Sequence, residues 1–190
     1  GLFHPCDYEQ KIELCPGIHV RFRDVGHLLG SSSIEVWIEE DGVSKKIVFS
    51  GDIGNTNQPL IKDPLYVDDA DYVVMESTYG NRSHDQGISL LDCKSELKQI
   101  LKETLAAGGN LVIPCFAVGR TQEILYFLRQ LKVDHELPEF EHTEVFVDSP
   151  LAVEATNIFM TNTQECFDEE AMALVRQGIN PIRFPGLRLS

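Results

Sequence analysis

Apolar and polar residues alternate in short runs through the first eighty residues. The alternation covers residues 18–23 and again residues 34–39, and a period of two is typical of strands with one buried face. Asp41-Gly42 follows the second run and favours a tight turn, so the sequence predicts a hairpin over residues 34–49. Residues 72–75 are apolar throughout, which predicts a strand buried on both faces.

After Gly80 the pattern becomes one of helices alternating with strands. The predicted elements are an amphipathic helix over residues 88–107 stopped by Gly108-Gly109, a buried strand over 110–115, a helix after Gly119-Arg120-Thr121, a short strand over 144–147 and a helix capped by Ser149-Pro150. Such alternation indicates a parallel, Rossmann-like sheet. We therefore expect an α/β protein that divides near residue 80.

Length and composition narrow the class of protein. The 190 residues, 43% of them hydrophobic, are enough for one core or two small ones packed together. No run approaches the roughly 20 apolar residues of a membrane span, and the first residues lack the layout of a signal peptide. We expect a soluble cytoplasmic protein without a membrane partner.

Cysteine spacing and charge exclude some functions and count against others. The five cysteines are odd in number, scattered and without a C-x-x-C pair, which argues against a disulfide framework or a thiolate zinc site and predicts reduced, mostly buried thiols. The formal charge of −14 is spread along the chain, and no basic stripe is visible. Taken alone this counts against a nucleic-acid partner, although bound divalent cations would offset part of the charge.

Three turns share a design suited to chemistry, in which a strand end enters a glycine-containing turn that carries a metal-binding or acid/base group. They span residues 24–31, 50–54 and 76–80, with His27, Asp52 and Glu76 as the groups. Glycine lets the backbone turn sharply and approach a ligand closely. Each residue also has an ordinary explanation, namely a hydrogen-bonded loop histidine, an Asx-turn aspartate and a strand-end acid in a salt bridge.

In combination these motifs resemble a known family. Gly26-His27-Leu28-Leu29-Gly30-Ser31, Ser50-Gly51-Asp52-Ile53-Gly54 and Glu76-Ser77-Thr78-Tyr79-Gly80-Asn81-Arg82 resemble, in order, the third and fourth metal motifs and the first β-CASP motif of the metallo-β-lactamase/β-CASP nucleases. The likeness continues through residues 113–123 and 147–152 and covers nearly the whole chain. It is closer to the RNA-processing branch than to the DNA-repair branch.

The resemblance implies a fold and a function. Residues 1–80 would form the C-terminal-side part of a metallo-β-lactamase β-sandwich, and residues 81–190 the first part of a Rossmann-like β-CASP domain. The parent protein would be a zinc-dependent ribonuclease, cutting internally or from the 5′ end, with RNA as its partner. His27 would ligate one of two zinc ions, Asp52 would bridge both, and Glu76 would orient a later histidine that protonates the leaving group.

Two further residues are weaker candidates for binding substrate. Arg120 follows a glycine turn and would contact backbone phosphate, while its ordinary explanation is a helix-start arginine in a surface ion pair. His84 is a polar loop histidine, a type that is usually only solvated. Ser149 is expected to cap a helix and not to act as a nucleophile.

The main metal-binding signature of this family, His-x-His-x-Asp-His, does not occur in the chain. We therefore expect a truncated chain that binds zinc weakly or not at all, does not catalyse hydrolysis and exposes apolar sheet surface, which favours self-association into homo-oligomers. Two alternatives stay open: a non-catalytic β-CASP scaffold in an RNA-processing complex, and a small-molecule metallohydrolase. Retention of His27, Asp52 and Glu76 disfavours the scaffold.

Overall fold

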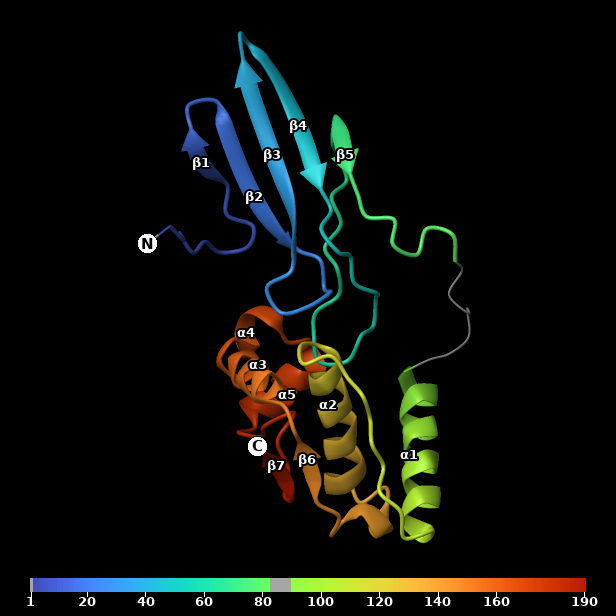
Figure 1. Cartoon of the computed structure of the whole chain (residues 1–190). Coiled ribbons are helices and arrows are strands. Elements are labelled where there is room, and N and C mark those ends of the chain that lie inside the picture. Colours follow the sequence, from blue (N-terminus) through green and yellow to red (C-terminus); the bar gives the residue numbers. More distant parts are fainter. Residues whose placement is uncertain (1, 83–89) are drawn as a thin grey trace. The chain divides into compact units, whose positions relative to one another are not determined.

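The computed structural model describes residues 2–82 and 90–190 (Figure 1). The chain forms two compact units, one made of Gly1–Thr56 and Asp63–Ser83, the other of Asn57–Lys62 and His84–Ser190. The sequence pattern divides the chain near residue 80 and gives no sign that residues 57–62 belong to the second unit.

The first unit is built on a five-stranded sheet in the order β1-β2-β3-β4-β5. Its strands are β1 (Ile12–Cys15), β2 (Ile18–Asp24), β3 (Ser32–Glu40), β4 (Val43–Phe49) and β5 (Tyr72–Val74). Only β4 and β5 pair in parallel; the other neighbours are antiparallel. The predicted hairpin over residues 34–49 is confirmed as β3 and β4. Asp41 and Gly42 join them with φ of 52° and 77°, as a two-residue hairpin turn of type I′ requires.

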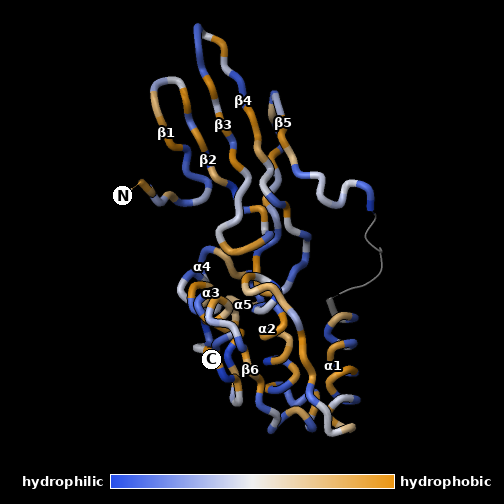
Figure 2. Tube along the Cα trace, in the orientation of Figure 1, coloured by the Kyte–Doolittle hydropathy of each residue, from blue (hydrophilic) through white to orange (hydrophobic). Residues whose placement is uncertain are grey.

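A cluster of charged side chains is buried on the polar face of this sheet. Hydrophilic and hydrophobic positions alternate along the central strands (Figure 2), yet Glu35 on β3 has no exposed side-chain surface. Its carboxylate pairs with Arg21 on β2 and with Lys46 on β4, the latter at 2.6 Å. Burial opposes ionisation of Glu35, but the hydrogen bonds from Arg21 and Lys46 outweigh it and lower its pKa.

The same cluster of charged side chains also holds the loop of residues 63–71 against the sheet. The Lys46 ammonium contacts Asp69 at 2.9 Å, and the Lys46 backbone N–H donates to the Asp71 carboxylate at 2.8 Å. Arg23 adds a hydrogen bond from its guanidinium to the Tyr66 carbonyl at 2.7 Å. Residues 63–71 are therefore fixed against β2 and β4 by charged side chains.

Two expectations about burial in the chain were wrong. Strand β5 exists, but Tyr72, Val73 and Val74 are more than half exposed, because β5 lies at the edge of the sheet. Four of the five cysteines are exposed and only Cys166 is buried, and none of the five forms a disulfide. Periodicity does not reveal which strand lies at an edge, and the spacing of cysteines along a chain does not show whether each one is buried.

The second unit contains most of the helices. Its elements are α1 (Leu90–Ala106), α2 (Arg120–Val133), the 3₁₀ helix η1 (Pro138–Phe140), β6 (Val145–Val147), α3 (Pro150–Thr161), α4 (Thr163–Cys166), α5 (Glu169–Arg176) and β7 (Leu187–Leu189). The predicted helices at α1 and α2 and the strand at β6 are confirmed. Ser149 caps α3, since its Oγ accepts the Ala152 N–H at 3.2 Å. β6 pairs with β7 in parallel, so the described chain is a mixed α/β protein.

The predicted buried strand over residues 110–115 was wrong. This segment forms no strand, and Val112 is 83% exposed. A strand is stabilised by hydrogen bonds to a neighbour, and no described strand pairs with this segment. None of the helices in the described residues combines the length and apolar character that crossing a bilayer requires.

Residues 57–62 dock into the core of the second unit. The Leu60 N–H donates to the Asp168 carboxylate at 3.0 Å, and the Asp168 N–H donates back to the Leu60 carbonyl at 3.1 Å. Leu60 is almost fully buried, and Ile61 forms an antiparallel bridge with Phe167. The chain thus enters the second unit briefly, at Asn57, only five residues after the glycine turn at residues 50–52.

Replacing Glu35 by glutamine is expected to lower the free energy of unfolding by about 3 kcal/mol, the lower end of the range for breaking a buried pair, because the part-buried Arg21 would lose its carboxylate partner and the buried Lys46 would keep only the exposed Asp69. Urea denaturation measures the change. Glu39→Gln is the matched control, an exposed residue on the same strand, and should change stability by less than about 0.5 kcal/mol. Equal effects of the two substitutions would contradict the role given to the buried cluster.

Candidate functional site

The three candidate loops lie at the edge of the first sheet that is formed by strand ends, and not at an outer strand. His27 follows β2, Asp52 follows β4 and Glu76 follows β5. β3 lies antiparallel between β2 and β4, and β5 is parallel to β4, so β2, β4 and β5 run in the same direction. Their carboxyl ends therefore meet at the same edge.

Backbone contacts join the histidine loop to the aspartate loop. The Gly54 N–H donates to the Val25 carbonyl at 2.9 Å. A Cβ placed on Gly54 would lie 1.9 Å from the Gly26 carbonyl oxygen and 2.8 Å from the His27 nitrogen. Only glycine permits this approach, so the residues flanking His27 and Asp52 are in direct contact.

Glu76 ties the third loop to the second. Its carboxylate accepts the Ile53 N–H at 2.8 Å, and its own N–H donates to the Ser50 Oγ at 3.1 Å. The hydrogen bond from Ile53 lowers the pKa of Glu76, with further lowering by Thr78 and by the nearby His27. Glu76 is thus a carboxylate at neutral pH, suited to accepting hydrogen bonds and not to donating a proton.

The loop that carries His27 is closed by two side chains. The Asp24 carboxylate, buried at the end of β2, accepts the Gly26 N–H at 2.8 Å. The Ser31 hydroxyl accepts the N–H groups of His27 and Leu28 at 3.2 and 3.0 Å. His27 is half-buried and Asp52 exposed, so both are accessible to a ligand.

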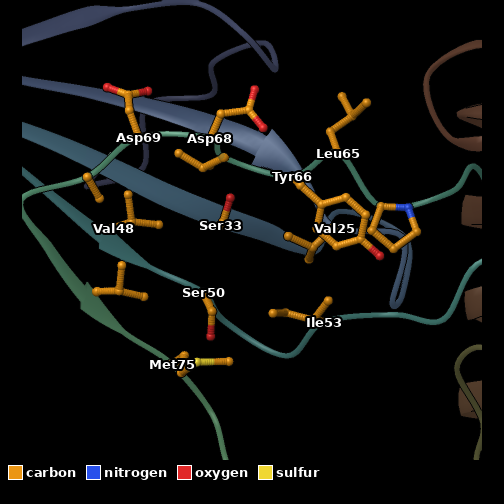
Figure 3. Close-up of a pocket in the computed structure, with 14 residues that line it drawn as sticks. Val25, Ser33, Val48, Ser50, Ile53, Leu65, Tyr66, Asp68, Asp69 and Met75 are labelled. Carbon is orange, nitrogen blue, oxygen red and sulfur yellow. The ribbon is translucent and has the colours of Figure 1, made fainter.

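A pocket of about 380 Å³ lies beside the three loops in the first unit (Figure 3). Its wall includes Val25, Ile53 and Met75, each one or two residues from a candidate residue. Leu65 and Tyr66 cover it from the 63–71 loop. The pocket is mainly apolar and backs the loops, so it is distinct from the exposed edge where Asp52 lies.

Two of the candidate residues are of types that bind metal ions. His27 and Asp52 supply an imidazole nitrogen and a carboxylate, donor types that zinc and related divalent ions take. In residues 2–82 and 90–190 no three histidine, cysteine, aspartate or glutamate side chains gather closely enough to hold a metal ion. A metal held by His27 and Asp52 would complete its coordination with other groups.

The described contacts of these loops do not include Arg120. Arg120 begins α2 in the second unit, where its side chain, 67% exposed, pairs with Glu123 at 2.7 Å. This contact is the surface ion pair of a helix-start arginine that the sequence offered as the alternative to phosphate binding. His84 lies outside the described residues.

Sequence patterns alone missed three residues that shape the site. Ser31 and Ser50 each use a hydroxyl to hold a candidate loop, and Gly54 permits the loop contact. All three residues belong to the glycine- and serine-containing motifs of the candidate loops, and this feature of the sequence could have pointed to them. Their partners are set by the pairing of distant strands, so their roles were not evident from spacing.

Replacing Gly54 by alanine is expected to destabilise the protein by about 1–3 kcal/mol, the usual range for overpacking, because the new methyl group overlaps the Gly26 carbonyl. Urea denaturation measures the loss. The control is Gly109→Ala, where the nearest atoms to the new Cβ, both of Thr104, lie at an ordinary 3.4 Å. A Gly54→Ala protein as stable as the control would show that the two loops do not touch as described.

Comparison with known proteins places this arrangement in a family. Residues 121–190 match the family model described as the Beta-Casp domain. Ribonuclease TTHA0252 of Thermus thermophilus is 34% identical over 189 residues, which is 100% of this chain and 41% of the relative. Transcription termination factor FttA of Methanosarcina mazei is 33% identical over 179 residues, covering 93% of this chain and 27% of the relative.

A eukaryotic relative extends the comparison. Endoribonuclease YSH1 of Yarrowia lipolytica is 29% identical over 179 residues, 94% of this chain and 20% of that protein. The chain thus spans about two fifths or less of the length of these three relatives. The motifs, the domain match and the relatives agree, and the chain belongs to the metallo-β-lactamase/β-CASP family.

Proposed function

We propose that this chain provides part of the active site of a metal-dependent hydrolase that cleaves phosphodiester bonds in RNA. The observation that carries the proposal is the meeting of His27, Asp52 and Glu76 loops at one sheet edge, joined by the hydrogen bonds from Gly54 and Ile53. Relatives of the chain named as ribonucleases support RNA as the substrate.

His27 and Asp52 would hold the metal, with zinc as the proposed ion. An aspartate has two carboxylate oxygens, so Asp52 is suited to bridging two ions, and its exposed position leaves both oxygens accessible. When bound, the metal supplies Lewis-acid stabilisation of the negative charge that develops on the phosphate.

Glu76 would orient an imidazole that delivers a proton to the departing oxygen of the RNA. Its carboxylate already accepts hydrogen bonds from Ile53 and Thr78, which fixes its direction, and an ionised carboxylate holds an imidazole N–H strongly. Protonation of the leaving group is a separate task from metal binding. The histidine that would complete this pair is expected from another part of the protein.

The two units would take their places in the larger fold of the family. The first, near residues 1–80, would be the C-terminal-side part of a metallo-β-lactamase sandwich; the second, near 81–190, the first part of a Rossmann-like β-CASP domain. The mixed sheet and the parallel β6–β7 pair support this assignment. Arg120 is proposed as a phosphate contact that would exchange Glu123 for RNA, and His84 stays a prediction.

Metal content and RNA cleavage of the whole protein with Asp52→Asn test the proposal. Asparagine keeps the size of the aspartate but loses its charge, so bound metal should fall. Loss of a group that only supports a metal ligand costs up to about 100-fold, and loss of a ligand should cost at least as much, so cleavage should slow by at least about 100-fold. Inductively coupled plasma mass spectrometry and a labelled single-stranded RNA give the two measurements.

Asp68→Asn is the matched control, an exposed aspartate of the same unit, and should leave metal content and cleavage unchanged. If Asp52→Asn cleaves RNA at the normal rate, Asp52 is not part of the active site. If the unaltered protein neither binds metal nor cleaves RNA, the scaffold alternative replaces the nuclease.

A further inference from the structure

We propose that Ser31 is a positioning residue that holds the His27 imidazole in the direction of the metal. The inference rests on the proposed function, because it takes His27 as a metal ligand. Ser31 would touch neither metal nor RNA and would act only through the backbone on which His27 stands.

The Ser31 hydroxyl uses its full hydrogen-bonding capacity within this loop. Its oxygen accepts the N–H groups of His27 at 3.2 Å and Leu28 at 3.0 Å, and its proton is donated to the Leu28 carbonyl at 2.8 Å. A hydroxyl offers one donor and two acceptor sites, so all of them are occupied. The Ser31 N–H also donates to the Leu28 carbonyl, at 3.0 Å.

Both sides of this closed loop are anchored. On one side the Asp24 carboxylate accepts the Gly26 N–H, and the Val25 carbonyl accepts the Gly54 N–H at 2.9 Å. On the other side the Tyr8 hydroxyl donates to the Ser31 carbonyl at 3.1 Å. His27 is the residue between the anchors, and the hydroxyl of Ser31 is the group that fixes its backbone N–H.

The direction of a metal ligand matters at small scale. Ligands must lie within about 0.5 Å and 10–20° of the productive geometry, and removing an outer partner of a ligand costs about 10- to 100-fold in metal affinity. Ser31 acts on the backbone and not on the ring, so we expect a loss near the lower end. Without the hydroxyl, the N–H groups of His27 and Leu28 lose their acceptor and the loop opens towards solvent.

Zinc affinity of the whole protein, measured with Zn²⁺ alone by competition with a chromophoric chelator, tests the inference. Ser31→Ala should raise the dissociation constant about ten-fold. Ser33→Ala is the control: it lies two residues away, and its buried hydroxyl makes no hydrogen bond among the described residues. The control should bind Zn²⁺ within about two-fold of the unaltered protein.

A second pair of variants separates positioning from folding. Ser31→Thr keeps the hydroxyl, while Ser31→Val has nearly the same shape without it, so the threonine protein should bind Zn²⁺ about ten-fold more tightly than the valine protein. The visible spectrum of bound Co²⁺ should match the unaltered protein in Ser31→Thr and shift in Ser31→Val. Equal affinities and equal spectra for this pair would overturn the inference.

His27→Ala, measured in parallel, distinguishes failure of this inference from failure of the proposed function. If His27→Ala binds Zn²⁺ as well as the unaltered protein, His27 is not a ligand and both proposals fail. If His27→Ala loses affinity while threonine and valine at position 31 behave alike, only the role of Ser31 fails.

Discussion

The site in the first unit depends on the contact between two glycine turns. Gly54 passes the Gly26 carbonyl so closely that a Cβ at this position would lie 1.9 Å from the oxygen, and the Gly54 N–H donates to Val25. The loop of Asp52 and the loop of His27 are therefore packed backbone to backbone. Glu76 adds the third loop by accepting the Ile53 N–H. Two glycines and one carboxylate thus bring together groups separated by about fifty residues of chain.

The rest of the unit supports these exposed groups from behind. The buried pairing of Glu35 with Lys46 holds the central strands and, through Asp69, the 63–71 loop. Candidate residues can then stay accessible at the sheet edge while the scaffold is fixed elsewhere. The formal charge of −14 counts against a nucleic-acid partner, and under the proposed function a divalent cation near Asp52 would offset part of that charge.

Local chemistry predicted the elements that depend on neighbouring residues. The Asp41-Gly42 hairpin, the Ser149 cap and the end of α1 near Gly108 all follow from backbone preferences within a few residues. Features that depend on distant partners were predicted wrongly or missed. The strand predicted over residues 110–115 was wrong because no described strand pairs with this segment. The entry of residues 57–62 into the second unit was missed. The acceptors that hold the candidate loops together depend on strand register, so the sequence did not reveal them.

The most direct test of the account is to add Mn²⁺ to the isotopically labelled protein and record which backbone amide signals broaden. The paramagnetic ion broadens the signals of nearby nuclei, so the amides whose signals broaden show where on the structure the ion binds. If the three loops share one metal site, the amides of residues 26–31, 51–54 and 76–78 will broaden together at the lowest Mn²⁺ concentration. Broadening that reaches only one of these loops, or begins at exposed acidic residues elsewhere, would contradict a shared site.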